Sequence, residues 1–375
     1  MSDFGIYTHS PFCRSKCSYC DFNSYSGREE LVEAYVDVLL EQIDAVANSA
    51  DRPTVTSVYF GGGNPALLGA AAPERLLTAV RKNFSLAGDA EISAELNPED
   101  ASIDLLKEWR AAGINRISLG WQSLDDGCLK LLGRRHDAEA AIESLATANR
   151  AGFADVNVDM IYGLPGQTQA QWVRDLKKVM AKAPTHISAY MLSVEPGTPL
   201  ARAVADREVI PLEDDVVADM YIKTAAALAA GGYPQYEISN YSVPGRECRH
   251  NLNYWLGGDY LGFGAGAHSH WRGRRWWSHS EPAEFIRMIE AGGERGSELL
   301  DAPSRAAERI MLGLRLNAGV DIERLSQEFQ LDLRRQYAVV IKDLTEQGLL
   351  DAGGRLMLTG RGRLLANEAM AAFLE

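Results

Sequence analysis

The segment that decides the fold is residues 7–24, YTHSPFCRSKCSYCDFNS, in which Cys13, Cys17 and Cys20 form the pattern C-x3-C-x2-C. The pattern directly follows a short apolar run, residues 5–9, which is predicted as a strand. Three thiolates this close on one loop can converge on a single metal centre. The chain has only five Cys, an odd number, so the cluster indicates metal or redox chemistry rather than a secreted disulfide framework.

Two kinds of metal centre are compatible with three clustered cysteines. A structural zinc site is usually closed by four ligands, and His9 is a candidate for the fourth. A [4Fe–4S] cluster normally uses four Cys thiolates, so three would leave one iron with an open position for an external ligand. Both centres stay open from the cysteines alone, and the position of the pattern after a first strand makes it more specific.

Outward from this loop, short apolar runs alternate with helical patterns. Repeated βα units predict a parallel sheet with covering helices. We expect a partial or complete βα barrel, with its site at the C-terminal ends of the strands; a doubly wound open sheet is the competing arrangement. The predicted strands after the first are 57–60, 91–96, 116–120, 155–161 and 186–194, and the predicted helices are 29–49, 72–84, 101–112, 137–151 and 168–182.

The remainder of the chain differs in pattern. A helix is predicted over 213–231, and residues 233–280 are dense in aromatics, Gly and His, which predicts a loop-rich functional region. Helices at 303–315, 321–329 and 331–348, a hairpin at 353–359 and a helix at 360–374 resemble a winged-helix module. The predicted domains are therefore 1–215, 216–300 and 301–375.

Composition and charge limit the classes of protein and partner that are compatible with this sequence. The chain has 375 residues, of which 46% are hydrophobic and 24% charged, with a formal net charge of −13, as in ordinary globular proteins. This acidic balance weighs against nucleic acid as the partner. The sequence has no stretch of about 18 uncharged apolar residues and no signal-peptide pattern at its N-terminus, so we expect no transmembrane segment and a cytoplasmic location.

Several further motifs follow the cysteines in order. Together with them, these motifs resemble the oxygen-independent coproporphyrinogen III oxidase-like family of radical S-adenosylmethionine (SAM) proteins, and within it the heme chaperone (HemW) branch. The resemblance covers nearly the whole chain and implies an α/β fold: a partial (β/α)6, TIM-like radical SAM barrel with a small helical, winged-helix-like C-terminal domain. The motifs are 61–65 GGGNP, 95–98 ELNP, 115–123 NRISLGWQS, 132–136 LGRRH, 157–167 NVDMIYGLPGQ, 195–198 EPGT and 250–255 HNLNYW.

The resemblance also assigns site residues. It implies that Cys13, Cys17 and Cys20 ligate a [4Fe–4S] cluster whose open iron binds SAM, and that a reduced cluster can break a carbon–sulfur bond of SAM. In the family the glycine run meets the methionyl amino group and Glu95 the ribose, while Arg134 can form a fork on the carboxylate. A tight turn, a surface Glu and ordinary packing are the structural alternatives. The implied SAM contacts are Tyr7, Tyr19, Gly62, Gly63, Asn64, Glu95, Gln122, Arg134 and Asp159.

Two residues depart from the family pattern near this site. Asn64 stands where Thr is usual, which leaves the role of its side chain open. Trp121 replaces a usually smaller residue, and it either narrows the pocket or fills the core.

A second site is expected at residues 248–255, CRHNLNYW. Neutral imidazole is a good ligand for heme iron, and the resemblance makes His250 the first candidate, with Cys248 a weaker one. The alternative is that His250 is a hydrogen-bonded core residue, while Tyr254 and Trp255 anchor this segment to the barrel. The motif does not show where the imidazole points.

Three classes of function are compatible with these residues. The first is a heme chaperone that binds heme, the cluster and SAM and delivers heme to acceptor proteins, some of them membrane-associated. The second is a radical SAM enzyme of porphyrin biosynthesis, either a coproporphyrinogen III oxidase or a related methyltransferase. The third is a zinc-stabilised barrel. Phe22 occupies the position where the oxidases of the family carry a fourth Cys, which favours the chaperone; whether SAM is turned over stays open.

Overall fold

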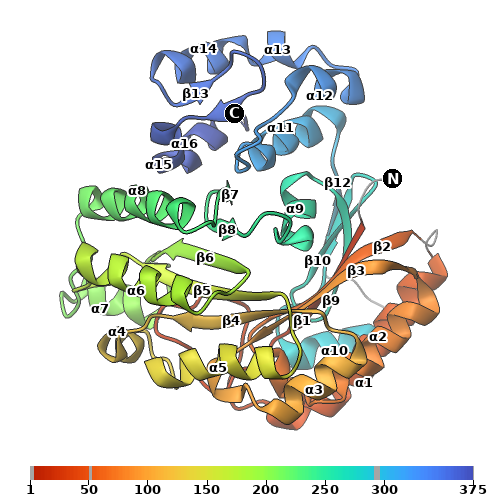
Figure 1. Ribbon diagram of the computed structural model, residues 1–375. Helices are drawn as coiled ribbons and strands as arrows, with labels where there is room; N and C mark the ends of the chain where they lie inside the picture. Colours follow the sequence, from red (N-terminus) through yellow and green to blue (C-terminus); the bar gives the residue numbers. More distant parts are fainter. Residues whose placement is uncertain (1–3, 50–52, 291–295, 375) are drawn as a thin grey trace.

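The computed structural model describes residues 4–49, 53–290 and 296–374. Six parallel strands lie side by side in chain order (Figure 1). This order never reverses, so the arrangement is the partial (β/α)6 barrel and not the doubly wound sheet. The six strands are β1 (Phe4–Ser10), β2 (Thr54–Gly62), β3 (Ser85–Leu96), β4 (Arg116–Gln122), β5 (Val156–Tyr162) and β6 (His186–Met191).

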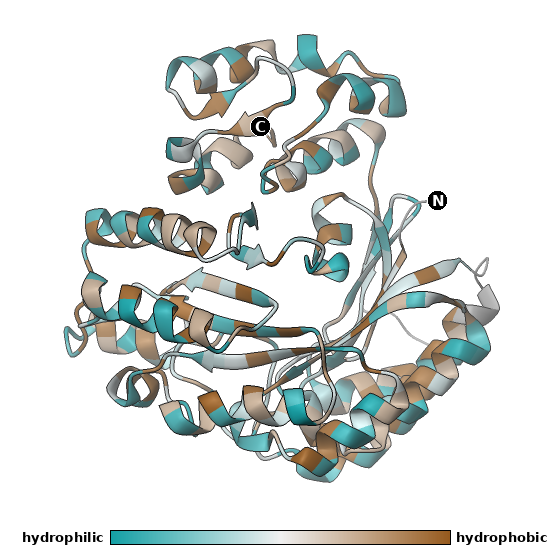
Figure 2. Cartoon of the chain, viewed as in Figure 1, coloured by the Kyte–Doolittle hydropathy of each residue, from teal (hydrophilic) through white to brown (hydrophobic). Residues whose placement is uncertain are grey.

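Helices between the strands cover the outside of the barrel. Hydrophobic and hydrophilic residues alternate along these helices (Figure 2), as expected where one face packs on a sheet. Side chains of Ser102, Asp137 and Thr168 cap three of them. The covering helices are α1 (Val32–Ser49), α2 (Ala72–Asn83), α3 (Ile103–Ala112), α5 (Ala138–Arg150), α6 (Gln169–Ala181) and α8 (Asp214–Ala230); α4 (Asp126–Leu131) and α7 (Pro199–Ala205) are short additions after β4 and β6.

Residues 233–280 contain short strands that the sequence analysis did not predict. The segment extends the sheet on both sides, because β9 pairs in parallel with β1 and β8 pairs antiparallel with β6. Its strands are short and interrupted by glycines, so they carry too little alternation to be recognised. The elements are β7 (Gln235–Glu237), β8 (Asn240–Ser242), α9 (Arg249–Trp255), β9 (Asp259–Phe263), β10 (His268–Trp271) and β11 (Arg274–Trp277), followed by α10 (Pro282–Glu290) and β12 (Gly296–Leu299).

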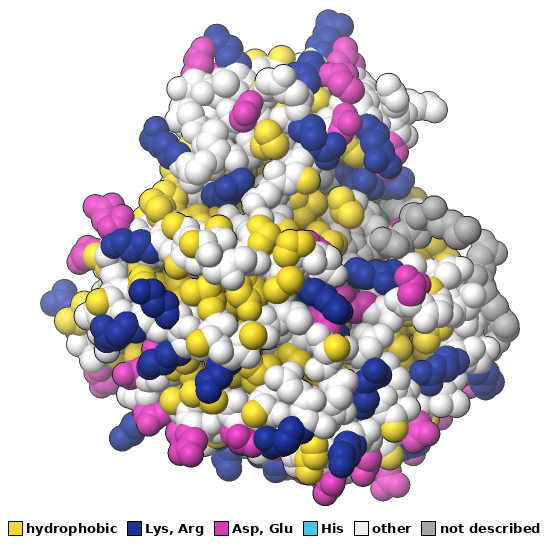
Figure 3. Space-filling model, in the orientation of Figure 1, with side chains coloured by type: hydrophobic (Ala, Val, Ile, Leu, Met, Phe, Trp, Pro, Cys, Tyr) yellow, Lys and Arg dark blue, Asp and Glu magenta, His cyan; other side chains and the backbone are white. Residues whose placement is uncertain are grey.

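The C-terminal unit has a hydrophobic core of its own, which includes Ile310, Leu333, Leu356 and Phe373. It lies as a separate layer beyond α8 and α9 (Figure 1), and its visible face mixes both signs of charge (Figure 3). The predicted hairpin is present in short form. The elements are α11 (Ala302–Gly313), α12 (Ile322–Phe329), α13 (Leu333–Gln336), α14 (Ala338–Glu346), β13 (Leu350–Asp351), β14 (Met357–Leu358), α15 (Gly360–Leu364) and α16 (Ala366–Ala371).

One arginine connects this unit to the barrel layer. Arg315, just after α11, forms an ion pair of 3.2 Å with Glu237 of β7, whose carboxylate is fully buried. The same guanidinium lies 4.3 Å from the centre of the Trp255 ring on α9. The C-terminal unit is therefore attached at the end of the barrel that α9 covers. In the described part of the chain, no helix is both long and apolar enough to cross a bilayer.

Candidate functional site

The inside of the barrel is polar. Every second residue of β4 faces one cavity of about 330 Å³, and β5 and β6 contribute in the same way, because side chains alternate between the two faces of a strand. TIM barrels usually fill this space with branched apolar side chains. Here the strands supply Arg116, Ser118, Gly120, Gln122, Asn157, Asp159, His186, Ser188 and Tyr190.

Cys13, Cys17 and Cys20 line one end of this cavity, on the loop after β1. Backbone hydrogen bonds hold that loop: the N–H of Cys13 donates to the carbonyl of Tyr25 at 2.9 Å. All three are free, partly buried thiols. Burial, followed by the neighbouring Cys thiolates, raises the pKa of Cys13 to about 11. Thiols gathered in this way become thiolates when a cation balances their charge.

The zinc alternative needs a fourth ligand, and His9 is not free to provide it. Its Nε2 lies 2.8 Å from the carbonyl oxygen of Asn23, and its Nδ1 lies 2.9 Å from the hydroxyl of Tyr7. Among the residues that the structure describes, no three His, Cys, Asp or Glu side chains are grouped closely enough to hold a single metal ion. Thiolates that each bind a different iron of a cluster are spaced more widely than the ligands of one ion.

The glycine run after β2 is shaped around the cysteine loop. A Cβ added to Gly63 would lie 2.6 Å from the carbonyl oxygen of Phe12 and 2.9 Å from the Sγ of Cys13. Gly62 has φ of +111°, a backbone conformation that favours glycine. Because Gly63 has no side chain, its backbone can lie against the cysteine loop and no Cβ projects toward the thiol of Cys13. The residues present therefore fit a cluster at this position.

Glu95 lies at the C-terminal end of β3 and lines the cavity. Its carboxylate accepts hydrogen bonds from the hydroxyl of Tyr59 at 2.9 Å and from the N–H of Gly62 at 3.1 Å. Burial, followed by the charge of Asp159, raises the pKa of Glu95 to about 7. Burial also raises the pKa of Asp159, which accepts hydrogen bonds from Ser118 and Asn157.

Arg134 lies beside the thiols. Its Nη1 is 3.5 Å from the Sγ of Cys17, and its Nη2 donates to Asn97 at 2.7 Å. Its Nε is buried without a hydrogen-bond partner in the described structure, which is unusual for an arginine. Gln122, also in the cavity lining, has φ of +66° at an irregularity in β4. Strain of this kind often occurs at ligand sites.

The two departures from the family pattern have structural roles. Asn64 lines the cavity, but its amide donates to Asp100 at 2.7 Å and its Oδ1 accepts from the N–H of Ala66. Trp121 is fully buried, and its indole donates to Ser144 at 3.1 Å. Trp121 therefore fills the core between β4 and α5 and does not narrow the pocket.

The structure brings nearly all of the predicted SAM contacts into one cavity. Tyr7 is the exception, because it does not line the cavity and its hydroxyl bonds to His9. Tyr19 lines the cavity and packs near Leu132 and Ile161. The residues in the lining are Tyr19, Gly62, Gly63, Asn64, Glu95, Gln122, Arg134 and Asp159, together with the three cysteines.

His250, the predicted heme ligand, lies outside the cavity lining and is only 1% exposed. Its Nδ1 is 2.9 Å from the hydroxyl of Ser57, and its Nε2 is 2.9 Å from the hydroxyl of Tyr254. Burial lowers the pKa of this imidazole to about 3. Both ring nitrogens are occupied by protein groups, so the geometry supports the alternative of a hydrogen-bonded core residue.

The sequence reasoning missed three groups at the site. Tyr59 holds Glu95, Arg116 lines the cavity while paired with Asp155 at 2.7 Å, and Glu91 caps α9 through the N–H groups of residues 249 and 250. The available signal was the period of two: polar residues recur at every second position of β3 to β6. This pattern indicates which residues face the inside of the barrel, but it does not indicate which residues contact one another there.

Comparisons with known proteins agree with this geometry. Residues 7–179 match the model of the radical SAM superfamily, and residues 300–365 match the HemN C-terminal domain. Heme chaperone HemW of Mycobacterium tuberculosis is 40% identical over 99% of this chain and 95% of that protein, and heme chaperone HemW of Bacillus subtilis is 32% identical over 98% of both. The structure of coproporphyrinogen III oxidase (HemN) from Escherichia coli, described as a radical SAM enzyme, superposes with a TM-score of 0.87 at 26% identity, covering 99% of this chain and 90% of that one.

The barrel order, the thiols at one end of the lumen and the full-length similarity lead to the same assignment. The chain belongs to the radical SAM superfamily and, within it, to the family of HemW heme chaperones.

Proposed function

We propose that this chain is a heme chaperone that holds a [4Fe–4S] cluster and SAM at the open end of its barrel, binds heme, and transfers it to acceptor proteins. The observation that carries the proposal is the meeting of three free thiols with the glycine run, Glu95 and Arg134 in one cavity, in a chain that is similar to heme chaperones over its full length.

Different residues of the site would bind the cluster and the separate parts of SAM. Cys13, Cys17 and Cys20 would hold the cluster, and Gly63 leaves room beside them. Glu95 would accept hydrogen bonds from ribose hydroxyls, and Arg134 would present its guanidinium to a carboxylate. A cluster bound here would supply one-electron reducing chemistry to a SAM molecule on its open iron.

The rival function is the oxidative decarboxylation of a porphyrinogen. The superposition on the Escherichia coli oxidase supports the rival at the level of fold. Phe22 argues against it, because this side chain, 60% exposed in the cavity lining, takes the place of the fourth Cys of the oxidases. Incubation of the reconstituted protein with coproporphyrinogen III, SAM and a reductant tests the rival. We expect no protoporphyrinogen; its formation at enzymatic rates would overturn the chaperone proposal.

Heme transfer tests the proposed function directly. Heme added to the reconstituted protein should shift the Soret band, and the band of a heme-free acceptor protein should then appear on mixing. The control is the same mixture with free heme at equal concentration. Transfer no faster than from free heme would contradict the proposal. The proposal leaves the ligand of the heme iron unassigned, because both ring nitrogens of His250, the ligand predicted from the sequence, already have protein partners, Ser57 and Tyr254.

The cytoplasmic location, the membrane association of some acceptors and the three-domain division stay predictions. The division has one point in its favour and one against. Residues 306–373 share a core of their own, whereas Tyr241, Leu261 and Phe263 of the predicted middle domain belong to the barrel core.

A further inference from the structure

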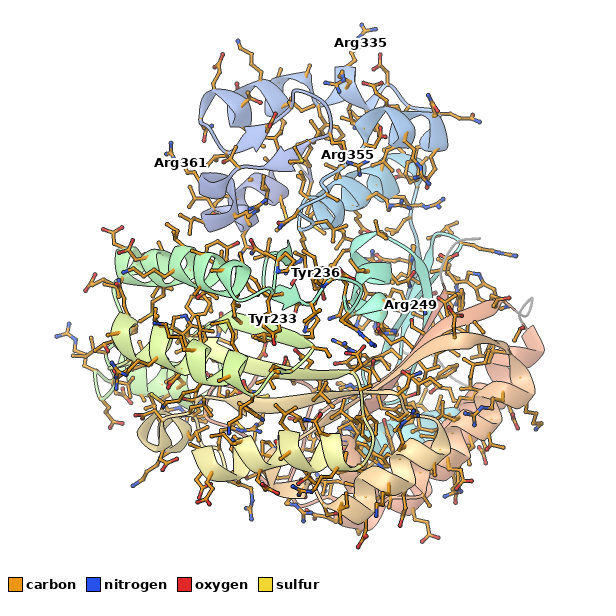
Figure 4. All side chains as sticks on the ribbon, viewed as in Figure 1. Tyr233, Tyr236, Arg249, Arg335, Arg355 and Arg361 are labelled. Atoms are coloured by element: carbon orange, nitrogen blue, oxygen red, sulfur yellow. The ribbon has the colours of Figure 1, made fainter. Side chains whose placement is uncertain are left out.

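The segment that carries H-N-x-x-Y-W lies at the N-terminal end of β1, whereas the cysteine loop follows the C-terminal end of the same strand. Helix α9 begins at Arg249, where the buried carboxylate of Glu91 accepts hydrogen bonds from the N–H groups of Arg249 at 2.9 Å and of His250 at 3.1 Å. The helix lies between the barrel strands and the C-terminal unit (Figure 4, where Tyr236 and Arg249 are labelled at this level). From there, the side chain of His250 enters the barrel.

Inside the barrel the ring of His250 packs against the inward faces of β1 and β2. A Cβ added to Gly5 of β1 would lie 3.2 Å from its Cε1, so glycine at that position leaves space for the imidazole. The ring stacks on Tyr59, with centroids 5.1 Å apart and planes 23° apart. Together with the hydrogen bonds to Ser57 and Tyr254, these contacts fix the ring in position and orientation.

Tyr59 connects this packing to Glu95, at the C-terminal end of β3. Its hydroxyl donates to Glu95 at 2.9 Å, and the other oxygen of Glu95 accepts from the N–H of Gly62. Tyr59 also stacks on Tyr7, with centroids 6.2 Å apart, and the Tyr7 ring lies 6.5 Å from the ring of His250 as well. The hydroxyl of Tyr7 bonds to His9. The second ring nitrogen of His9 bonds to the carbonyl of Asn23 in the cysteine loop. The stack on His250 therefore leads to Glu95 and to the loop that carries the thiols.

We infer that His250 is a positioning residue for the SAM site: it fixes the ring of Tyr59, which in turn holds the carboxylate of Glu95 toward the cavity. This inference rests on the proposed binding of SAM at Glu95. It assigns the histidine of the motif to the lumen of the barrel and not to heme iron. The two roles exclude each other in this geometry, because both ring nitrogens already have protein partners.

The test uses the full chain with its cluster reconstituted anaerobically, and compares His250→Ala, Tyr59→Phe, the double variant and Trp255→Phe. Trp255 is on the same helix but contacts Arg315 of the C-terminal unit, so its variant is the matched control. SAM affinity is measured by calorimetry, cluster content by iron analysis, and heme binding by Soret titration. Each variant's thermal unfolding midpoint shows whether it is folded.

We expect His250→Ala to weaken SAM binding roughly tenfold while iron content and heme affinity stay unchanged, because contacting residues couple by factors of this order. Adding Tyr59→Phe should weaken SAM binding by less than the product of the single effects. Trp255→Phe should leave SAM affinity unchanged. Unchanged SAM affinity in His250→Ala, or a loss of heme binding in its place, would overturn the positioning role and leave the proposed function standing. Absence of SAM binding by the unmodified chain would overturn both.

Discussion

The two ends of the barrel lumen differ in the contacts that their side chains make. At the C-terminal ends of the strands, three free thiols line the cavity beside Arg134. At the N-terminal ends, Glu91 accepts two backbone hydrogen bonds from α9, and both nitrogens of His250 have protein partners. Buried atoms without a described partner occur at both ends, at the Nε of Arg134 and at the Nε1 of Trp255, so they do not distinguish the ends. From the thiols and the cavity we propose that ligands bind at the C-terminal ends, whereas α9 supports the N-terminal ends.

The largest expected effect is loss of the cluster when one of the three thiols is removed. Cys17→Ala removes one thiolate, and two thiolates cannot hold a cluster in place, so bound iron should fall to background with the fold intact. Iron analysis and visible absorbance after anaerobic reconstitution measure this. Cys128→Ala is the control, because Cys128 lies on α4 outside the cavity lining. Retention of a full cluster by Cys17→Ala would contradict the assignment.

The next effect concerns the space beside the thiols. Gly63→Ala places a Cβ 2.6 Å from a backbone oxygen, so the cysteine loop must move and cluster content should fall severalfold. Gly88→Ala is the matched control, since its Cβ would meet nothing within 4 Å. Iron content per chain measures both. Equal iron in the two variants would mean that this close approach does not shape the site.

A smaller effect depends on pH. The pKa of Glu95 rises from 4.5 to about 7 on folding, so the stability linked to its protonated form is complete below 4.5 and is lost as the pH rises through about 7. Glu95→Gln cannot ionise. Its free energy of unfolding, relative to the unmodified chain, should therefore increase by up to about 3 kcal/mol between pH ~5 and pH ~8. Denaturant unfolding of the cluster-free protein at both pH values measures this; a difference independent of pH would contradict the raised pKa.

The smallest expected effect is at Asn64. Asn64→Ala removes the cap on the turn that begins at Pro65 and the hydrogen bond to Asp100, which should cost about 1 kcal/mol of stability. SAM affinity should change little, because the side chain is already occupied. Denaturant unfolding and calorimetry separate the two quantities. A large loss of SAM affinity with unchanged stability would show that Asn64 contacts the cofactor.

The sequence was most informative where chemistry requires a residue type at a fixed spacing. The cysteine pattern, the glycine run and the carboxylate at the end of β3 all indicated a site at the C-terminal ends of the strands, because these ends converge in a parallel barrel. Tyr59 and Glu91 could not be found in this way, since their roles depend on the register between β2, β3 and α9. The strands of 233–280 were missed because each is short, and β9 acquires its pairing from β1, more than 200 residues away in sequence.

The orientation of His250 illustrates the same limit. H-N-x-x-Y-W contains a good iron ligand beside two aromatic residues, and nothing in that spacing distinguishes a ring directed at a ligand from one directed into a barrel. The contacts that position the ring come from Gly5, Ser57 and Tyr59, all of them distant from His250 in sequence.

Electron paramagnetic resonance of the anaerobically reconstituted, reduced protein, recorded before and after SAM is added, shows whether the chain holds a cluster with one iron open to SAM. We predict the signal of a reduced [4Fe–4S] cluster and a change in its g-values on addition of SAM, because one iron would have no protein ligand and SAM could bind there. A chain that takes up zinc and no iron, or a cluster signal that SAM leaves unchanged, would contradict this prediction.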